Sequence, residues 1–181
     1  MTEETYVSVD IETSGPIIGR HSMLALGACI TNDVTRRIHY MIKPISDDAE
    51  PAAMKIVGNS LAFFRENGVE PQTAQTQFRA WLQSECGAKQ PVFVGFNAAF
   101  DWGFVNWYFL TYIGTNPFGI APLDIKSYFA GLTGADWGNT RSSRIPAKYK
   151  PIATHTHDPL DDAIEQAAMF ERMRSEQRSN Q

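Results

Sequence analysis

The order of the predicted secondary-structure elements limits the folds open to this chain. Three segments rich in β-branched and apolar residues come first and predict consecutive strands, at residues 6–11, 23–31 and 37–42. Asn32-Asp33, between the last two, is typical of a tight turn. Helical patterns then alternate with two short apolar strands, at residues 51–67, 73–86, 91–96, 98–112, 122–124 and 125–132. This order predicts an α/β fold in which helices flank both faces of a mixed sheet.

The C-terminal part is predicted to be a loop followed by one helix. Residues 133–156 contain two prolines and a group of basic residues, which favours a loop. Asp158 is a suitable helix cap and Pro159 suits the first helical position, so a helix is expected from there to about residue 175. We expect a single domain over residues 1–181, with a core of about 5–175 and a short disordered tail.

Composition indicates a globular, cytoplasmic protein. Of the 181 residues, 43% are hydrophobic and 20% charged, which is enough apolar material for a buried core. No segment approaches the ~18 apolar residues that a membrane helix needs. The polar N-terminus lacks the pattern of a signal peptide. Cys29 and Cys86 lie far apart and fit no zinc spacing, so reduced structural thiols are expected.

The charge of the chain allows a nucleic-acid substrate without requiring one. A net charge of −4 by itself argues against binding phosphates. Four basic residues nevertheless fall within ten positions, at Arg141, Arg144, Lys148 and Lys150. They could contact substrate phosphates, although a solvated loop is the simpler alternative. Divalent cations bound by carboxylates would offset part of the negative charge.

Asp10 and Glu12 form the first group of candidate catalytic residues. Side chains two residues apart on a strand point to the same side, so these carboxylates should lie together. Neighbouring carboxylates repel unless cations lie between them, and Mg²⁺ and Mn²⁺ prefer such oxygen ligands. The alternative is that an Asp-x-Glu sequence only marks a turn.

Asp101, His157 and Asp162 complete the candidate set. Asp101 comes early in a predicted helix among apolar neighbours, where the helix dipole alone could also stabilise it. His157 precedes Asp162 by five positions at the start of the last helix. Asp161 and Asp162 lie about 100° apart on a helix, so only one of them should face the sheet. His155 is a competing histidine without an acidic residue at the same spacing.

These three groups resemble, in their order, the motifs of the DEDDh 3′→5′ exonucleases. Residues 9–15, together with Leu26-Gly27-Ala28, resemble the first motif, residues 94–104 the second and residues 157–163 the third. The resemblance spans about residues 6–170. Residues 116–118, 123–124 and 130–132 are most similar to the ribonuclease T branch of the family. Polymerase proofreading exonucleases are the other branch that the chain resembles.

The resemblance implies a ribonuclease H-like fold and a two-metal mechanism. Asp10, Glu12, Asp101 and Asp162 would bind two Mg²⁺ or Mn²⁺ ions, with Asp10 as the bridge. His157 would act as the general base that deprotonates water. The implied substrate is single-stranded nucleic acid with a free 3′ end, and the product is a nucleoside 5′-monophosphate. The candidates for binding the substrate are Thr13, Pro16, Ile17, Asn97 and Phe100. Candidates for stacking its bases are Phe96, Phe100, Trp102 and Phe118, although aromatic rings of this kind more often belong to the core.

Several alternatives remain open at this stage. RNA is favoured over DNA because of the ribonuclease T likeness, with a DNA proofreading or repair exonuclease as the alternative. A module that binds nucleic acid or docks to a polymerase without turnover is the alternative of another class. Relatives are often dimers, so a homodimer is also expected. Phe96 replaces a histidine common in the family, and residues 134–156 replace a leucine-rich helix.

Overall fold

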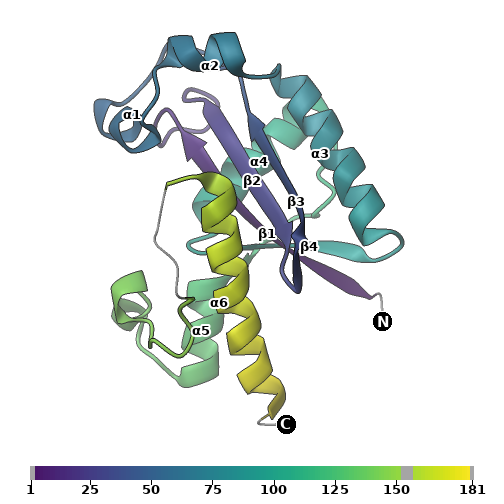
Figure 1. Cartoon of the computed structure of the whole chain (residues 1–181), viewed down its shortest axis with the longest axis vertical. Helices are drawn as coiled ribbons and strands as arrows, with labels where there is room; N and C mark the ends of the chain where they lie inside the picture. Colours follow the sequence, from purple (N-terminus) through teal and green to yellow (C-terminus); the bar gives the residue numbers. More distant parts are fainter. Residues whose placement is uncertain (1–2, 152–156, 180–181) are drawn as a thin grey trace.

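The computed structural model describes residues 3–151 and 157–179 of the chain (Figure 1). The strands are β1 (Glu4–Thr13), β2 (Met23–Ile30), β3 (Asp33–Met41), β4 (Gln90–Gly95) and β5 (Leu123–Asp124). The helices are α1 (Pro51–Val57), α2 (Leu61–Asn67), α3 (Pro71–Cys86), α4 (Ala99–Tyr112), α5 (Ile125–Thr133) and α6 (Pro159–Ser179), with short 3₁₀ turns η1 (Trp137–Asn139) and η2 (Ser142–Arg144).

The strands form one five-stranded mixed sheet in the order β3-β2-β1-β4-β5. β1, β2 and β3 are antiparallel neighbours, whereas β4 lies parallel to β1 and β5 parallel to β4. This topology is the ribonuclease H-like arrangement predicted from the sequence. It makes β1 the central strand, so residues at its C-terminal end lie in the middle of one sheet edge.

The two faces of the sheet are covered by different helices, because side chains alternate along each strand. Val7, Val9 and Ile11 of β1 join a core with Phe104 and Tyr108 of α4. On the other face, Cys29 of β2 packs against Ala163 and Ala167 of α6, and Val94 of β4 lies with Phe170. Figure 1 shows α6 crossing the sheet, with α3 and α4 on the opposite side. Even-numbered residues of β1 therefore face α6.

Three boundaries differ from the predicted ones for local reasons. The helix expected over 51–67 is two helices, because Gly58 takes a left-handed conformation (φ 76°) that ends α1 and Ser60 caps α2. β1 continues past Ile11 to Thr13, since its pairing with β2 extends that far. α6 continues beyond residue 175 to Ser179, where Gln177 accepts a hydrogen bond from Tyr128 of α5.

The described part of the segment after α5, residues 134–151, is a loop as predicted, with the two 3₁₀ turns η1 and η2, and it packs against the helices. Ile145 and Tyr149 are buried with Phe129 of α5. Lys148 forms an ion pair with Glu176 of α6, with 2.6 Å between Nζ and Oε2. The segment therefore lies beside α5 (Figure 1) and is joined to α6 through this ion pair. Residues 152–156, including His155, lie outside the described residues.

Candidate active site

β1 places Asp10 and Glu12 on the side of the sheet that α6 covers. Val9 and Ile11 point into the opposite core, so the alternation of the strand fixes the direction of the two carboxylates. Both residues lie within β1 and pair with β2, Asp10 opposite Gly27 and Glu12 opposite Ala25. The rigid central strand thus holds the first two candidate residues.

The start of α6 adds His157 and Asp162. Asp158 caps the helix through Oδ1, which accepts hydrogen bonds from the backbone N–H of Leu160 at 2.9 Å and of Asp161 at 3.2 Å. Asp162 is buried, whereas Asp161 is exposed. His157 has a left-handed backbone (φ 56°), which is rare outside glycine and turns the chain sharply into the helix.

Asp101 reaches the same place from the first turn of α4. Its Oδ1 accepts a hydrogen bond of 3.2 Å from the backbone N–H of Ile11, between Asp10 and Glu12. The chain reverses from β4 into α4 at Asn97, which also has a left-handed backbone (φ 64°). This turn brings the buried Asp101 carboxylate to the end of β1.

Glu12, His157 and Asp162 are close enough to share a cation. Each offers one ligand atom, and these atoms lie within 4.8 Å of one another. Oxygen-rich groups of this kind suit hard divalent cations. Asp10 and Asp101 interact electrostatically with the same cluster. The structure therefore brings all five candidate residues to one edge of the sheet.

Two carboxyl groups in the cluster are poorly stabilised as anions. Burial raises the pKa of Asp10 well above its usual range, and the neighbouring carboxylates of Asp101, Asp162 and Glu12 raise it further. Burial also raises the pKa of Asp101 to about 7, although backbone N–H groups oppose the change. Such carboxylates gain most from an added positive charge.

Gln166 is a residue of the site that the sequence analysis missed. Its Nε2 donates a hydrogen bond of 2.6 Å to Asp10 Oδ1, while its Oε1 accepts one of 2.8 Å from the backbone N–H of Phe96. The amide is thereby oriented by the backbone just after β4 and holds Asp10 of β1. Its position four residues after Asp162, on the same side of α6, was the available signal.

Asp124 is a second missed residue, and it supports the turn before α4. Its Oδ2 accepts a hydrogen bond of 2.9 Å from the backbone N–H of Ala98, and its Oδ1 caps α5 at Ser127 N. The turn that leads into α4, and thus to Asp101, is tied to the start of α5. Asp124 was noted only as part of a family likeness, because its contact with Ala98 is not local in sequence.

Two cavities border the carboxylate cluster. One of about 490 Å³ is lined by Glu12, Thr13, Pro16 and Phe100 together with α1. The other, of about 400 Å³, is lined by Asp10, Asp162, Phe96, Gln166 and Ser142. Among the substrate-binding candidates, Thr13, Pro16 and Phe100 therefore border the first cavity. Ile17 and Asn97 are exposed but do not line it.

The aromatic candidates for stacking have different environments. Phe100 is 37% exposed and Phe96 is half-buried at the second cavity. Phe118 is buried in the core against Phe78 and Phe93, so its prediction as a stacking platform is wrong. Trp102 also packs against that core. Both were chosen for their ring type, which does not distinguish core from surface.

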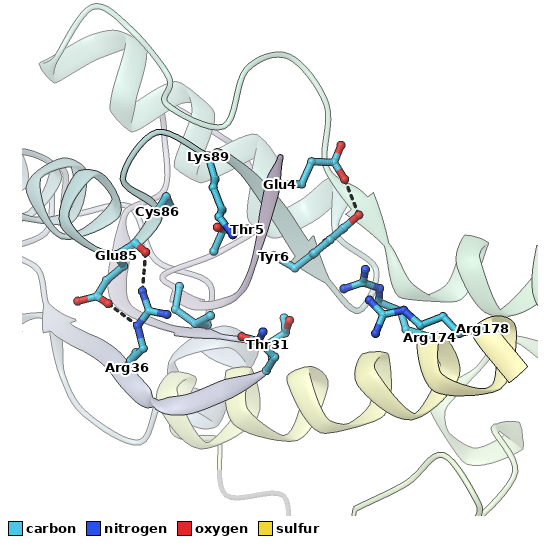
Figure 2. Close-up of a pocket in the computed structure, with 12 residues that line it drawn as sticks. Glu4, Thr5, Tyr6, Thr31, Arg36, Glu85, Cys86, Lys89, Arg174 and Arg178 are labelled. Carbon is cyan, nitrogen blue, oxygen red and sulfur yellow. Dashed lines mark hydrogen bonds and ion pairs between the residues drawn. The ribbon is translucent and has the colours of Figure 1, made fainter. Parts of the chain in front are cut away.

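A third cavity, of about 270 Å³, lies away from these residues, near the start of β1 (Figure 2). Three of the cations that line it, Arg36, Lys89 and Arg174, have partners within the chain. Figure 2 shows Arg36 bound to Glu85, and Arg174 lies over the Tyr6 ring at 4.0 Å from its centroid. Lys89 forms an ion pair of 3.0 Å with Glu3. This cavity lacks the clustered carboxylates of the sheet edge.

Carboxylates from a central strand and two helices, at one edge of a mixed sheet, define a ribonuclease H-like nuclease. The family model RNase_T, described as an exonuclease, matches residues 7–170 of this chain. The chain therefore belongs to this exonuclease family, and the resemblance to DEDDh 3′→5′ exonucleases is confirmed. It is also 48% identical over 169 residues to the 3′-5′ DNA exonuclease Cap18 of Escherichia coli, covering 93% of this chain and 90% of that protein.

Solved structures show the same fold at low sequence identity. The nuclease domain of 3′hExo, a DEDDh family member bound to rAMP, aligns with a TM-score of 0.77 and 14% identity over 95% of this chain and 92% of that one. Escherichia coli exonuclease I in complex with a dT13 oligonucleotide gives a TM-score of 0.72 and 17% identity, over 98% of this chain and 42% of that one. Within residues 3–151 and 157–179, no helix is long and apolar enough to cross a membrane.

Proposed function

We propose that the protein is a divalent-metal-dependent exonuclease that removes nucleotides from the 3′ end of single-stranded DNA and releases nucleoside 5′-monophosphates. The observation that carries this proposal is the meeting of Asp10, Glu12, Asp101, Asp162 and His157 at one sheet edge, between two cavities. Exonucleases of this family generally use divalent metal ions. Four carboxylates and one histidine supply the ligands and the base that such chemistry needs.

The carboxylates fit two Mg²⁺ or Mn²⁺ ions. Buried carboxyl groups with a raised pKa, such as Asp10 and Asp101, are costly as anions unless cations neutralise them. Asp10 interacts with the other three carboxylates and would bridge the ions, with Glu12 and Asp162 completing one site and Asp101 holding the other. Bound there, the cations would stabilise the charge that develops on the scissile phosphate.

His157 is the proposed general base. It is exposed and lies beside Glu12 and Asp162, where a water could attack the last phosphodiester. An imidazole nitrogen of His157 would take the proton of that water, and the 3′ oxygen of the preceding nucleotide would leave. Histidine suits this step because its ordinary pKa is about 6.5.

The cavity beside Glu12 is the proposed site of the terminal nucleotide. Its volume, about 490 Å³, is within the usual range for small-molecule sites. Phe100 and Pro16 offer apolar surface to the base and sugar, and backbone donors near Thr13 could read the 3′ hydroxyl. Ile17 and Asn97 lie at the surface around the site and could contact the next nucleotide.

DNA is proposed as the substrate because the relative at 48% identity is a DNA exonuclease. The preference for RNA favoured by the ribonuclease T likeness is not confirmed, and the assay below compares the two. A cytoplasmic location also remains a proposal, supported by the free, buried Cys29 and Cys86. The expected homodimer is a prediction that light scattering would test.

The proposal is tested with 5′-labelled single-stranded DNA and RNA, each carrying a 3′ hydroxyl or a 3′ phosphate. We expect a stepwise ladder with Mg²⁺ or Mn²⁺, none in chelator, and faster cleavage of DNA with a free 3′ hydroxyl. Asp10→Asn should abolish cleavage. Hydrolysis in chelator would reject the metal mechanism, and cuts in a circular strand would reject the exonuclease. Binding without turnover would favour the non-catalytic module.

A further inference from the structure

Trp137 is an unusually exposed aromatic residue near the active site. It begins η1, and 60% of its surface is exposed, whereas the other three tryptophans, at 81, 102 and 107, pack against the main core. An exposed tryptophan offers a large, rigid aromatic surface on which a ligand can stack. Trp137 lies in the segment where the sequence departs from the family pattern, so no motif pointed to it.

Lys126 links Trp137 to the active-site region. Its Nζ lies 4.5 Å from the centroid of the Trp137 ring and 3.2 Å from Oδ1 of Asn97. Lys126 is in the first turn of α5, where the helix dipole disfavours a cation, so helix stability does not account for it. Asn97 follows Phe96, which lines the same cavity as Asp10 and Asp162. Through Asn97, the Trp137–Lys126 pair is therefore joined to the residue that follows Phe96 of that cavity.

The backbone that carries Trp137 is held in place. Its carbonyl oxygen accepts hydrogen bonds from the Thr140 backbone N–H at 3.1 Å and from the Thr140 hydroxyl at 2.8 Å. Arg144 donates to Asn139 Oδ1 at 2.7 Å, which closes η1 onto η2. Thr140 itself is fully buried. Trp137 is thus an exposed ring on an ordered support, which lowers the entropy lost when a ligand stacks on it.

The surroundings of the ring fit a strand of unpaired nucleotides. A nucleobase stacks well on an indole ring whatever its sequence, and neighbouring cations attract the phosphates. Lys126 lies against the ring, and Arg141 and Arg144 are exposed in the same segment. Ser142 of that segment lines the cavity with Asp10. The terminal-nucleotide cavity lies beyond the carboxylates, on the Glu12 side.

We propose that Trp137 is a stacking platform for an unpaired base on the 5′ side of the scissile phosphate, with Lys126 beside a backbone phosphate of the same strand. The platform rests on the proposed function, because it assumes a single-stranded nucleic-acid substrate. The single-stranded nucleic acid passes Trp137, crosses the cavity lined by Phe96 and Ser142, and ends in the cavity lined by Thr13 and Phe100. Substrates too short to reach Trp137 do not use the platform.

The test compares kcat/KM for oligo-dT of two and of ten nucleotides. Trp137→Ala should lower the value for the decamer about 5- to 100-fold more than for the dinucleotide, the range expected from loss of one base–aromatic stack. Trp137→Phe should recover most of the difference. Leu110→Ala, which removes another exposed apolar side chain on α4, is the matched control and should leave the ratio unchanged. Equal losses on both lengths, or no loss on the decamer, would overturn the proposal.

Measuring oligonucleotide binding without metal tests the stacking platform separately from hydrolysis. With chelator present, the decamer should quench tryptophan fluorescence in the natural protein and much less in Trp137→Phe. Lys126→Gln should reduce the salt dependence of binding by about one slope unit. If no oligonucleotide is hydrolysed but quenching is retained, the proposed activity fails and the platform stands. Equal quenching in Trp137→Phe would reject the platform even if hydrolysis is observed.

Discussion

The backbone of Gly27 in β2 lies directly against Pro159 at the start of α6. A Cβ atom at position 27 would lie 2.3 Å from the carbonyl carbon of Pro159, closer than any real contact of that kind. Gly27 also pairs with Asp10 across the sheet. The lack of a side chain at position 27 thus allows the first turn of α6 to approach the strand that carries Asp10. His157 and Asp162 depend on this approach.

Gly27→Ala should therefore impair both stability and catalysis. The added methyl group meets backbone atoms, which cannot move aside without shifting α6, and overpacking of this kind costs about 1–3 kcal/mol. We expect a lower free energy of unfolding in denaturant titrations and a large loss of turnover. Gly131→Ala is the control, because a Cβ there meets nothing within 4 Å and alanine favours the helix. Unchanged activity in Gly27→Ala would show that α6 need not approach β2 so closely.

Gln166 should control metal affinity through Asp10. Its amide is fixed by Phe96 N and donates to Asp10 Oδ1, so Gln166→Ala removes the group that orients the proposed bridging ligand. Losing such a supporting partner typically costs about 10- to 100-fold in metal affinity or activity. Mn²⁺ binding measured by calorimetry should weaken accordingly. Gln177→Ala, on the same helix, should leave it unchanged, since Gln177 bonds Tyr128 instead. Equal Mn²⁺ affinity in all three proteins would reject this role.

Features set by local sequence could be predicted, whereas those set by tertiary contacts could not. The alternation of β1 indicated that Asp10 and Glu12 share a side, and Asp158-Pro159 indicated where α6 begins. Both follow from neighbours along the chain. The contact of Gln166 with Asp10 joins residues 156 positions apart, and the helical spacing from Asp162 indicates only the side of α6, not the partner. The apolar pattern of a helix continues past residue 58, but Gly58 takes a left-handed conformation there and ends α1. The backbone conformation of one residue therefore decides the boundary, and the spacing of apolar residues does not.

Ring type likewise did not reveal whether an aromatic residue was exposed. Phe118 was expected to be a stacking candidate and is core, whereas Trp137 was not singled out and is exposed. The difference arises from which helix or strand covers each ring. The four basic residues at 141–150 show the same limit, since Lys148 is paired with Glu176 of α6. Charge clusters in a sequence do not show which cations already have a partner.

The metal-free protein should lose stability as the pH rises. Burial raises the pKa of Asp101 from 3.8 to about 7 in the folded chain, so between these values the folded state keeps a proton that the unfolded state has lost. The contribution of Asp101 to the free energy of unfolding therefore falls with pH through this window and levels off above about 7. Asp101→Asn keeps an acceptor for Ile11 N and should flatten the change. Thermal unfolding in chelator at pH 5 and pH 8 measures it.

Divalent ions should reverse this loss. Metal binding requires ionised carboxylates, so Mg²⁺ or Mn²⁺ should raise the melting temperature more at pH 8 than at pH 5. An ion at 100 times its Kd adds about 2.7 kcal/mol, which for a chain of this size corresponds to roughly 5–10 °C. Asp10→Asn should remove most of the increase. An equal effect of Mg²⁺ at both pH values would indicate that the clustered carboxylates do not bind the ion.

The role of His157 can be separated from that of a metal ligand. His157 lies with Glu12 and Asp162, so its imidazole could act either as the base or as a further ligand. As the base, it is worth about 10²- to 10⁴-fold in turnover, and His157→Ala should show that loss while Mn²⁺ affinity changes little. His155→Ala is the natural control, because the His-x4-Asp spacing to Asp162 belongs to His157 alone, and it should have a small effect.

The two measurements on His157→Ala give distinct outcomes. A large fall in turnover with Mn²⁺ affinity retained supports the general base, because the carboxylates then hold the ions without it. A parallel fall in both quantities would make His157 a ligand, as its distance to Glu12 and Asp162 allows. Should His155→Ala be the more damaging change, the third motif has been assigned in the wrong register. Asp161, which is exposed in the structure, would then have to replace Asp162 as the ligand, and α6 would have to turn to bring it to the sheet.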